Sequence, residues 1–199
     1  VHLATGNYND STAKLYTDCG IFTCDERFGE DATAVFNMLS GYPEPKRWNR
    51  LIVAPIWMKD RFVKMIEREA EHAKKGEEAH IAAKMNSLCD PEIIAALYYA
   101  SSCGVRIDLL IRGICCLKVG ISENIHVRSI VGNFLEHSRI FYFRNGGSDE
   151  IYMGSADWMP RNLDRRVEIV FPVEDERIKE EIMHVLDLEF RDNVKAHIL

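Results

Sequence analysis

The sequence predicts an α/β fold in which helices cover the faces of a parallel or mixed sheet. Short apolar runs alternate with amphipathic stretches in the order strand, helix, strand, helix, strand, and this order favours parallel strands. Four further apolar runs follow, and Asn145-Gly146-Gly147 predicts a hairpin turn between the second and third of these. The predicted strands cover residues 50–55, 80–88, 105–113, 123–132, 138–145, 150–157 and 165–173.

Three helices accompany these strands. The stretch 59–75 has apolar residues at helical spacing on one face and charged residues on the other, as in a surface helix that packs on a sheet. The helix at 90–104 begins with Asp90 as a capping residue and Pro91 at its first position, where a proline costs no hydrogen bond. A last amphipathic helix is predicted over 174–191.

The N-terminal part is predicted to belong to a separate unit. A predicted strand and helix precede the polar, proline-bearing stretch 41–50, which is the best boundary in the chain. These two elements cover 15–24 and 29–41. We therefore divide the chain into domains at 1–45 and 46–199. Because the chain begins inside VHLATG, which has the pattern of a strand, we expect it to be part of a longer protein.

The composition is that of a folded domain with no membrane-spanning segment. The 199 residues carry a net charge of -6. Because salt screens charges beyond about 8 Å, a phosphate ligand would need a local basic lining. No apolar run approaches the ~20 residues that span a bilayer. None of the six cysteines forms a CxxC pair or a zinc-like spacing, so we predict buried free thiols in a reducing compartment.

A candidate phosphate site comes from two neighbouring strands. His137 and Arg139 are two positions apart, so they point to the same face of a strand. The small residues of the Gly154–Asp157 segment let the backbone approach a ligand, while Ser155 offers a hydroxyl and Asp157 could orient an imidazole. A single strand histidine is more often structural than catalytic, and this small-residue segment favours a site.

Polar side chains also end two neighbouring strands of the predicted sheet. Lys84 and Asn86 end one strand and Arg112 ends the next. Ligands gather at the carboxyl ends of parallel strands, which makes these residues site candidates. A salt bridge to a surface carboxylate explains Arg112 equally well at this point.

The opening segment repeats the small-residue pattern in a fainter form. ATGNYN, at positions 4–9, aligns Asn7 with Asp157 and Tyr8 with Trp158. Trp158 itself is predicted to lie in the core. Two such copies facing each other would form one site with two halves.

Two facing copies are the plan of the phospholipase D superfamily, whose motif is H-x-K followed by G-S-x-N. Here Arg139 takes the lysine position and Asp157 takes the asparagine position. These departures fit a narrower family. The strings HLATGNYND, LYTD, AKMNSLCDPEII, LLIRGICCL, SENIHVRSIVG, FLEHSRIFYF and GSADWMPRNLDRRVE resemble the C-terminal region of the long-chain polyphosphate kinase family.

This resemblance implies a phospholipase D-like mixed sheet flanked by helices. Residues 46–199 would form one complete domain, and residues 1–45 the tail of the preceding one. It also implies reversible transfer of the terminal phosphate of ATP, with Mg²⁺, to inorganic polyphosphate through a phosphohistidine. That histidine would lie upstream of this chain, as would the residues associated with the metal, so no metal ligand is expected here.

The resemblance assigns roles to three residues. His137 would lie beside the transferring phosphate as a catalytic residue that also contacts the nucleotide. Tyr16 would stack near the nucleotide, and Arg112 would contact its phosphates. Candidates to line the phosphate or polyphosphate path are Asn7, Arg139, Ser155, Asp157, Arg161 and Arg165, the last two from charge alone.

Two alternatives remain open at this stage. A phospholipase D-like phosphodiesterase would need lysine at position 139, and a non-catalytic nucleotide- or polyphosphate-binding module fits this chain taken by itself. The expected partners are ATP or ADP and polyphosphate, without nucleic acid, in a homo-oligomer of the longer protein. The expected location is the cytoplasm, with peripheral association at the inner membrane face as an option.

Overall fold

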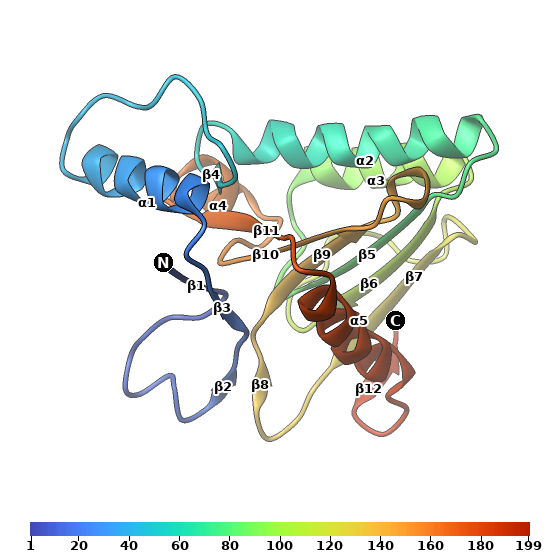
Figure 1. The fold of residues 1–199 in the computed structure, drawn as a ribbon. Coiled ribbons are helices and arrows are strands. Elements are labelled where there is room, and N and C mark those ends of the chain that lie inside the picture. Colours follow the sequence, from blue (N-terminus) through green and yellow to red (C-terminus); the bar gives the residue numbers. More distant parts are fainter.

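The chain folds around one large mixed sheet, which a computed structural model describes for all residues 1–199 (Figure 1). The strand order is β12-β7-β6-β5-β9-β10-β11-β4. The parallel strands are β5 (His80–Met85), β6 (Arg106–Ile111) and β7 (Ile125–Ile130). Strand β9 (Arg139–Phe143) runs antiparallel to β5, which makes the sheet mixed, as the sequence predicted.

The other half of the sheet is antiparallel. Strands β9 and β10 form the predicted hairpin, and its turn needs left-handed backbone at Asn145, Gly146 and Gly147, with φ of 49°, 62° and 99°. The remaining strands of the sheet are β10 (Glu150–Gly154), β11 (Ile169–Val173), β4 (Ile52–Val53) and β12 (Ala196–Ile198).

Helices cover both faces of the sheet, as Figure 1 shows. Helices α2 (Met58–Lys74) and α3 (Pro91–Ser102) lie side by side on one face, and α1 (Glu26–Leu39) and α5 (Glu176–Arg191) pack on the other. Strand β5 is buried on both sides, because Ile81 and Ala83 face the first pair while Ala82 faces the second. This explains why the central strands are nearly continuously apolar.

An aromatic cluster anchors α2 to the sheet. The ring centroids of Phe62 and Phe141 lie 4.7 Å apart, and that of Trp158 lies 5.2 Å from Phe141. All three side chains are fully buried, which confirms the core position predicted for Trp158. Truncation of one such ring typically costs about 3–5 kcal/mol of folding free energy.

Asp90 caps α3 as predicted, since its Oδ1 accepts hydrogen bonds from the backbone N–H groups of Glu92 and Ile93, both at 3.1 Å. The short helix α4 (Pro160–Asp164) and strand β12 were not predicted. No helix combines the length and the apolar character that crossing a membrane requires.

The N-terminal segment departs from the predicted single strand at 15–24. It forms β2 (Tyr16–Thr17) and β3 (Gly20–Phe22), which have different partners. Strand β2 pairs in parallel with β8 (Leu135–Glu136), while β3 pairs antiparallel with β1 (His2–Ala4). The break between β2 and β3 places Asp18 at the junction with the large sheet.

The cysteine prediction was half right. All six thiols are free, but four are only partly buried and two, Cys24 and Cys116, are exposed. The physical reason is position, because these cysteines lie in turns and at the ends of helices and strands rather than inside them.

Candidate functional site

The candidate site lies where β5 and β6 end, β9 begins and β10 ends. The N-terminal segment crosses this edge, so that β2 lies beside β8 just before His137 (Figure 1). The backbone N–H of His137 donates to the carbonyl oxygen of Thr17 at 3.1 Å. The site is therefore assembled from both predicted domains.

His137 is held on two sides by residues of the N-terminal segment. Its Nδ1 lies 3.0 Å from Asp18 Oδ1, and its ring stacks on that of Tyr16 with 4.5 Å between centroids. Only 8% of the residue is exposed. An imidazole clamped in this way keeps one orientation at the edge of the sheet.

Asp18 is fixed in turn by Thr5 and Gly6. The Thr5 hydroxyl donates to Asp18 Oδ1 at 2.8 Å. A Cβ at Gly6 would lie 2.2 Å from Asp18 Oδ2, so only glycine allows this approach. Partial burial works to raise the pKa of Asp18, but the hydrogen bonds from His137 and Thr5 outweigh it and hold the pKa below its usual range.

Arg139 and Asp157 form a buried, two-point ion pair. Arg139 Nε lies 3.1 Å from Asp157 Oδ1, and Nη2 lies 3.3 Å from Oδ2; both side chains are 8% exposed. The two departures from the phospholipase D motif are therefore partners, since an arginine in the lysine position meets a carboxylate in the asparagine position.

The same arginine lies against the edge of the His137 ring that carries both nitrogens. Arg139 Nη1 lies 2.9 Å from His137 Nε2 and 3.0 Å from Nδ1, and a guanidinium can only donate. The imidazole thus has a guanidinium donor at this edge and the Asp18 carboxylate beside Nδ1.

A second arginine joins the cluster through Asn86. Asp157 Oδ1 accepts from the backbone N–H of Asn86 at 2.8 Å, and Asn86 Oδ1 accepts from Arg112 Nε at 2.7 Å. The terminal nitrogens of Arg112 have no protein partner. One continuous hydrogen-bonded series thus connects Thr5, Asp18, His137, Arg139, Asp157, Asn86 and Arg112.

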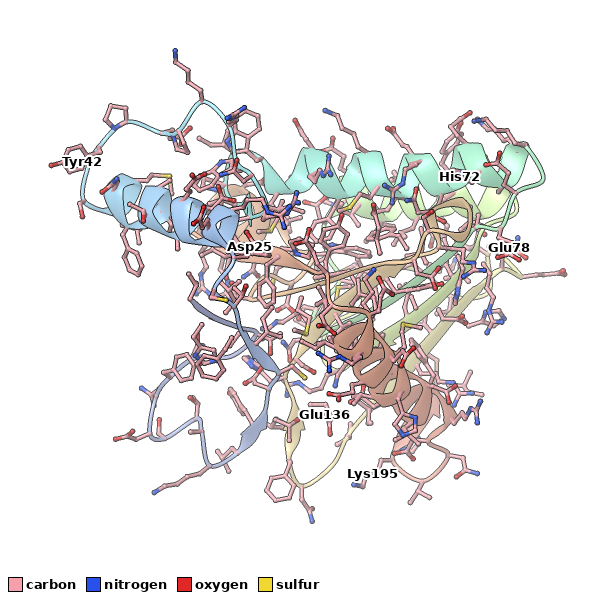
Figure 2. All side chains as sticks on the ribbon, viewed as in Figure 1. Asp25, Tyr42, His72, Glu78, Glu136 and Lys195 are labelled. Carbon is pink, nitrogen blue, oxygen red and sulfur yellow. The ribbon has the colours of Figure 1, made fainter.

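A buried charge cluster adjoins His137 on the side of α5. The Lys84 ammonium, 2% exposed, contacts both Glu136, at 3.0 Å, and Glu189. Figure 2 shows Glu136 between the N-terminal segment and α5. Burial raises the pKa of Glu189 to about 7, and Lys84 only partly opposes this rise. Burial also works against ionisation of Glu136, but Lys84 outweighs it and lowers that pKa.

The other predicted lining residues lie outside the hydrogen-bonded series. The Ser155 hydroxyl donates to Glu168 and its oxygen accepts from the backbone N–H of Ile169, so it faces β11. Asn7, Arg161 and Arg165 are exposed, and their side chains form no hydrogen bond or ion pair with the residues in the series. The structure thus brings together six of the predicted residues, Tyr16, Asn86, Arg112, His137, Arg139 and Asp157, and it places Lys84 beside them on Glu136.

Sequence reasoning missed Asp18, Thr5 and Glu189. Asp18 stands in the LYTD string that carried the family resemblance, which is the one signal that could have identified it. Thr5 and Glu189 offer no such signal, since their roles depend on contacts across the whole fold.

These residues do not fit a magnesium site. Mg²⁺ prefers carboxylate and water oxygens in octahedral geometry, and Asp18 and Asp157 are already engaged by His137 and Arg139. No group of three or more histidine, cysteine, aspartate or glutamate side chains is arranged to hold a metal ion.

Comparison with known proteins gives consistent results along the whole chain. Residues 1–45 match the family model for polyphosphate kinase C-terminal domain 1, and residues 51–199 match the model for C-terminal domain 2. Polyphosphate kinase from Synechocystis sp. is 57% identical over 98% of this chain and 27% of its own length. The enzyme of that name from Pseudomonas aeruginosa is 51% identical over 100% of this chain and 29% of its own length.

Solved structures agree with this. The crystal structure of polyphosphate kinase from Porphyromonas gingivalis matches with a TM-score of 0.95 and 43% identity, over 100% of this chain and 31% of that one. A phospholipase D family member from Salmonella typhimurium matches with a TM-score of 0.55 at 14% identity, over 75% of this chain and 95% of that one, which shows the fold alone. This chain spans less than a third of the length of the polyphosphate kinases it matches.

The fold prediction of a phospholipase D-like mixed sheet is therefore confirmed. Three findings lead to the same conclusion about the family. Two family models match the chain, a relative is identical at more than half of the aligned residues, and a crystal structure superposes on the fold. The chain belongs to the polyphosphate kinase family.

Proposed function

We propose that this chain supplies part of the catalytic centre of a polyphosphate kinase. The overall reaction is the reversible transfer of the γ-phosphate of ATP to the end of an inorganic polyphosphate chain. A histidine outside this chain attacks the γ-phosphorus and releases ADP, and the phosphohistidine then passes its phosphate to a terminal oxygen of the polyphosphate. Phosphoryl transfer depends mainly on positioning and charge neutralisation.

His137 contacts the transferring phosphate in this proposal. Both of its ring nitrogens lie within 3.0 Å of Arg139 Nη1, so an arriving phosphate oxygen would meet a guanidinium and an imidazole together. If the imidazole takes up a proton, Asp18 stabilises the resulting charge from the Nδ1 side. Tyr16, stacked on the ring, keeps water from one face of it.

Arg112 is proposed to hold nucleotide phosphates. Asn86 fixes its Nε, which leaves a planar pair of terminal N–H donors for phosphate oxygens, the geometry that arginine uses in bidentate recognition. Arg139 is more constrained, because Asp157 already occupies two of its donors. We assign it the role of orienting His137 and neutralising charge.

The observation that carries this proposal is the continuous hydrogen-bonded series from Asp18 through His137 to Arg112. It places two cationic groups and a polar imidazole at one sheet edge, with every carboxylate paired. Arg161 and Arg165, exposed on and after α4, remain candidates for the path of the polyphosphate, as do Asn7 and Ser155.

The test is the synthesis of polyphosphate from ATP and Mg²⁺ by a polyphosphate kinase that contains this chain. His137→Ala should abolish synthesis. His184→Ala is the matched control, since His184 is exposed on α5 and has no polar partner. Near-normal synthesis by the His137 variant would overturn the role given to this residue. Hydrolysis of DNA or phosphatidylcholine by the wild-type protein would favour the phosphodiesterase alternative.

A further inference from the structure

A second concentration of positive charge lies away from the candidate site. The loop before β4 and the first turns of α2 enclose a hollow of about 450 Å³, which we call the basic hollow. Its charged lining residues are Lys46, Arg47, Arg50, Asp60, Arg61 and Lys64. This is an unusual lining for a chain with a net charge of -6.

Most of these cations have no carboxylate partner. Arg50 pairs with Glu174 at 2.8 Å, whereas Lys46, Arg47, Arg61 and Lys64 form no salt bridge. With Asp60 as the single acid of the lining, an excess of three positive charges remains. Because all four cations line one hollow, a ligand bound inside it meets their charges together.

The adjoining surface does not offset this charge. A neighbouring hollow of about 460 Å³ shares Arg50 and Arg61 but also contains three carboxylates. These carboxylates belong to Asp149, Glu150 and Glu174, and each of them already pairs with an arginine. The excess charge is therefore confined to the basic hollow and would attract a compact ligand with several negative charges.

An exposed aromatic side chain stands at the same place. Trp57, 46% exposed, precedes α2 and lines the basic hollow. The cations come from two elements that the fold holds together, because Lys46 and Arg47 lie on the loop while Arg61 and Lys64 lie on successive turns of α2. The charge cluster is thus shared between this loop and the helix.

The basic hollow is distinct from the His137 cluster. Strand β4 ends the sheet three positions beyond β9, which corresponds to about 14 Å at a spacing of about 4.8 Å per strand. Figure 2 shows Tyr42, at the start of the loop, and Glu136, the neighbour of His137, at well-separated places. No residue is shared between the two.

We propose that the basic hollow binds a run of consecutive phosphates of an inorganic polyphosphate chain. The site would anchor the chain away from the transfer site, so that it stays attached between transfers. The choice of polyphosphate as the source of these phosphates rests on the proposed function; the recognition of a multiply charged phosphate chain rests on the charges alone.

The experiment is a titration of this chain with inorganic tripolyphosphate and with long-chain polyphosphate, followed by tryptophan fluorescence. Of the three tryptophans, Trp158 is fully buried whereas Trp48 and Trp57 both line the basic hollow. The response should therefore come from these two side chains and disappear in the double variant Trp48→Phe with Trp57→Phe. Arg61→Ala with Lys64→Ala should weaken tripolyphosphate binding at least about tenfold, which is the loss of two charge contacts of about 0.7 kcal/mol each. Binding should also weaken as salt is raised.

The matched control removes two exposed lysines outside the hollow, with Lys75→Ala and Lys118→Ala, and should change the affinity by less than about twofold. A second double variant, Lys46→Ala with Arg47→Ala, removes the two cations of the loop and should also weaken tripolyphosphate binding. It keeps the test decisive if the variant with Arg61→Ala and Lys64→Ala does not fold. Binding of tripolyphosphate by both hollow variants as tightly as by wild type would overturn the proposal.

ATP distinguishes the two sources of a phosphate chain, because it carries the same number of phosphates as tripolyphosphate. If ATP binds much more tightly, the hollow is a nucleotide site and the proposal is wrong. His137→Ala should bind tripolyphosphate as wild type does. Wild-type tripolyphosphate affinity in both hollow variants would overturn this proposal alone, whereas near-normal synthesis by His137→Ala would overturn the proposed function alone.

Discussion

Replacing Glu189 by glutamine should change how the stability of this chain depends on pH. Glu189 Oε2 is buried and has no hydrogen-bond donor, and burial raises the pKa of this carboxyl from 4.5 to about 7. Between these values the folded chain holds one more proton than the unfolded chain. The free energy of unfolding then falls by about 1.4 kcal/mol per pH unit as the pH rises.

The contribution that protonated Glu189 makes to the free energy of unfolding is therefore fully present below pH 4.5, and it is lost as the pH rises through about 7. Over this interval the loss amounts to about 3 kcal/mol. Glu189→Gln removes the ionisation and keeps the shape of the side chain. Relative to wild type, the variant should gain about 3 kcal/mol of stability between about pH 4.5 and about pH 8.

Urea unfolding followed by circular dichroism measures this difference directly. The control is Glu180→Gln, because Glu180 is an exposed residue of α5 without a salt bridge, and its difference from wild type should stay constant with pH. A difference between Glu189→Gln and wild type that varies by less than about 0.5 kcal/mol over this range would refute the reasoning.

Two further variants test the hydrogen-bonded series. Asp157→Asn leaves Arg139 charged and buried without a carboxylate, so denaturant unfolding should show that the free energy of unfolding falls by about 3–5 kcal/mol. The control Asp187→Asn breaks an exposed ion pair on a helix and should lower it by less than about 1 kcal/mol. Equal losses in the two variants would contradict the conclusion that burial makes the Arg139–Asp157 pair costly to break. Asp18→Asn should lower polyphosphate synthesis at least about tenfold, because the neutral amide no longer stabilises a protonated His137. The control Asp10→Asn changes an exposed residue and should have no effect on synthesis. Full activity of the Asp18 variant would show that this residue does not belong to the site.

The sheet and its helices could be predicted because local patterns determine them. Asp90 and Pro91 define the start of α3, and the left-handed turn at Asn145–Gly147 defines the β9–β10 hairpin. The spacing of His137 and Arg139 predicted that they share one strand face. His137 instead lies in the connection between β8 and β9, but the two side chains do contact each other. The short α4 and β12 were missed because elements of three to five residues carry almost no periodic signal.

The remainder of the site depends on distant contacts. Asp18 lies 119 residues from His137 in the sequence, and nothing local to either residue indicates their contact. The single strand expected at 15–24 failed for the same reason, since β2 leaves β3 to pair with β8. The buried Lys84–Glu189 contact likewise joins residues 105 positions apart.

The family resemblance supplied what local patterns could not. It added Tyr16 as a site candidate and gave Arg112, already a candidate from its strand end, a role towards phosphates. The structure places Tyr16 on the His137 ring and Arg112 next to Asn86. Their roles towards the nucleotide stay predictions. The Arg139–Asp157 pair gives a physical reason for two motif departures that looked unrelated in the sequence.

The central claim is that His137 assists a phosphohistidine that forms outside this chain. The most direct test is to locate the labelled phosphate by mass spectrometry after brief incubation with γ-phosphate-labelled ATP. In a polyphosphate kinase that contains this chain, we predict label on a histidine outside these 199 residues and none on the peptide with His137. This chain alone should take up no label. Phosphate bound to His137, in either protein, would contradict the account.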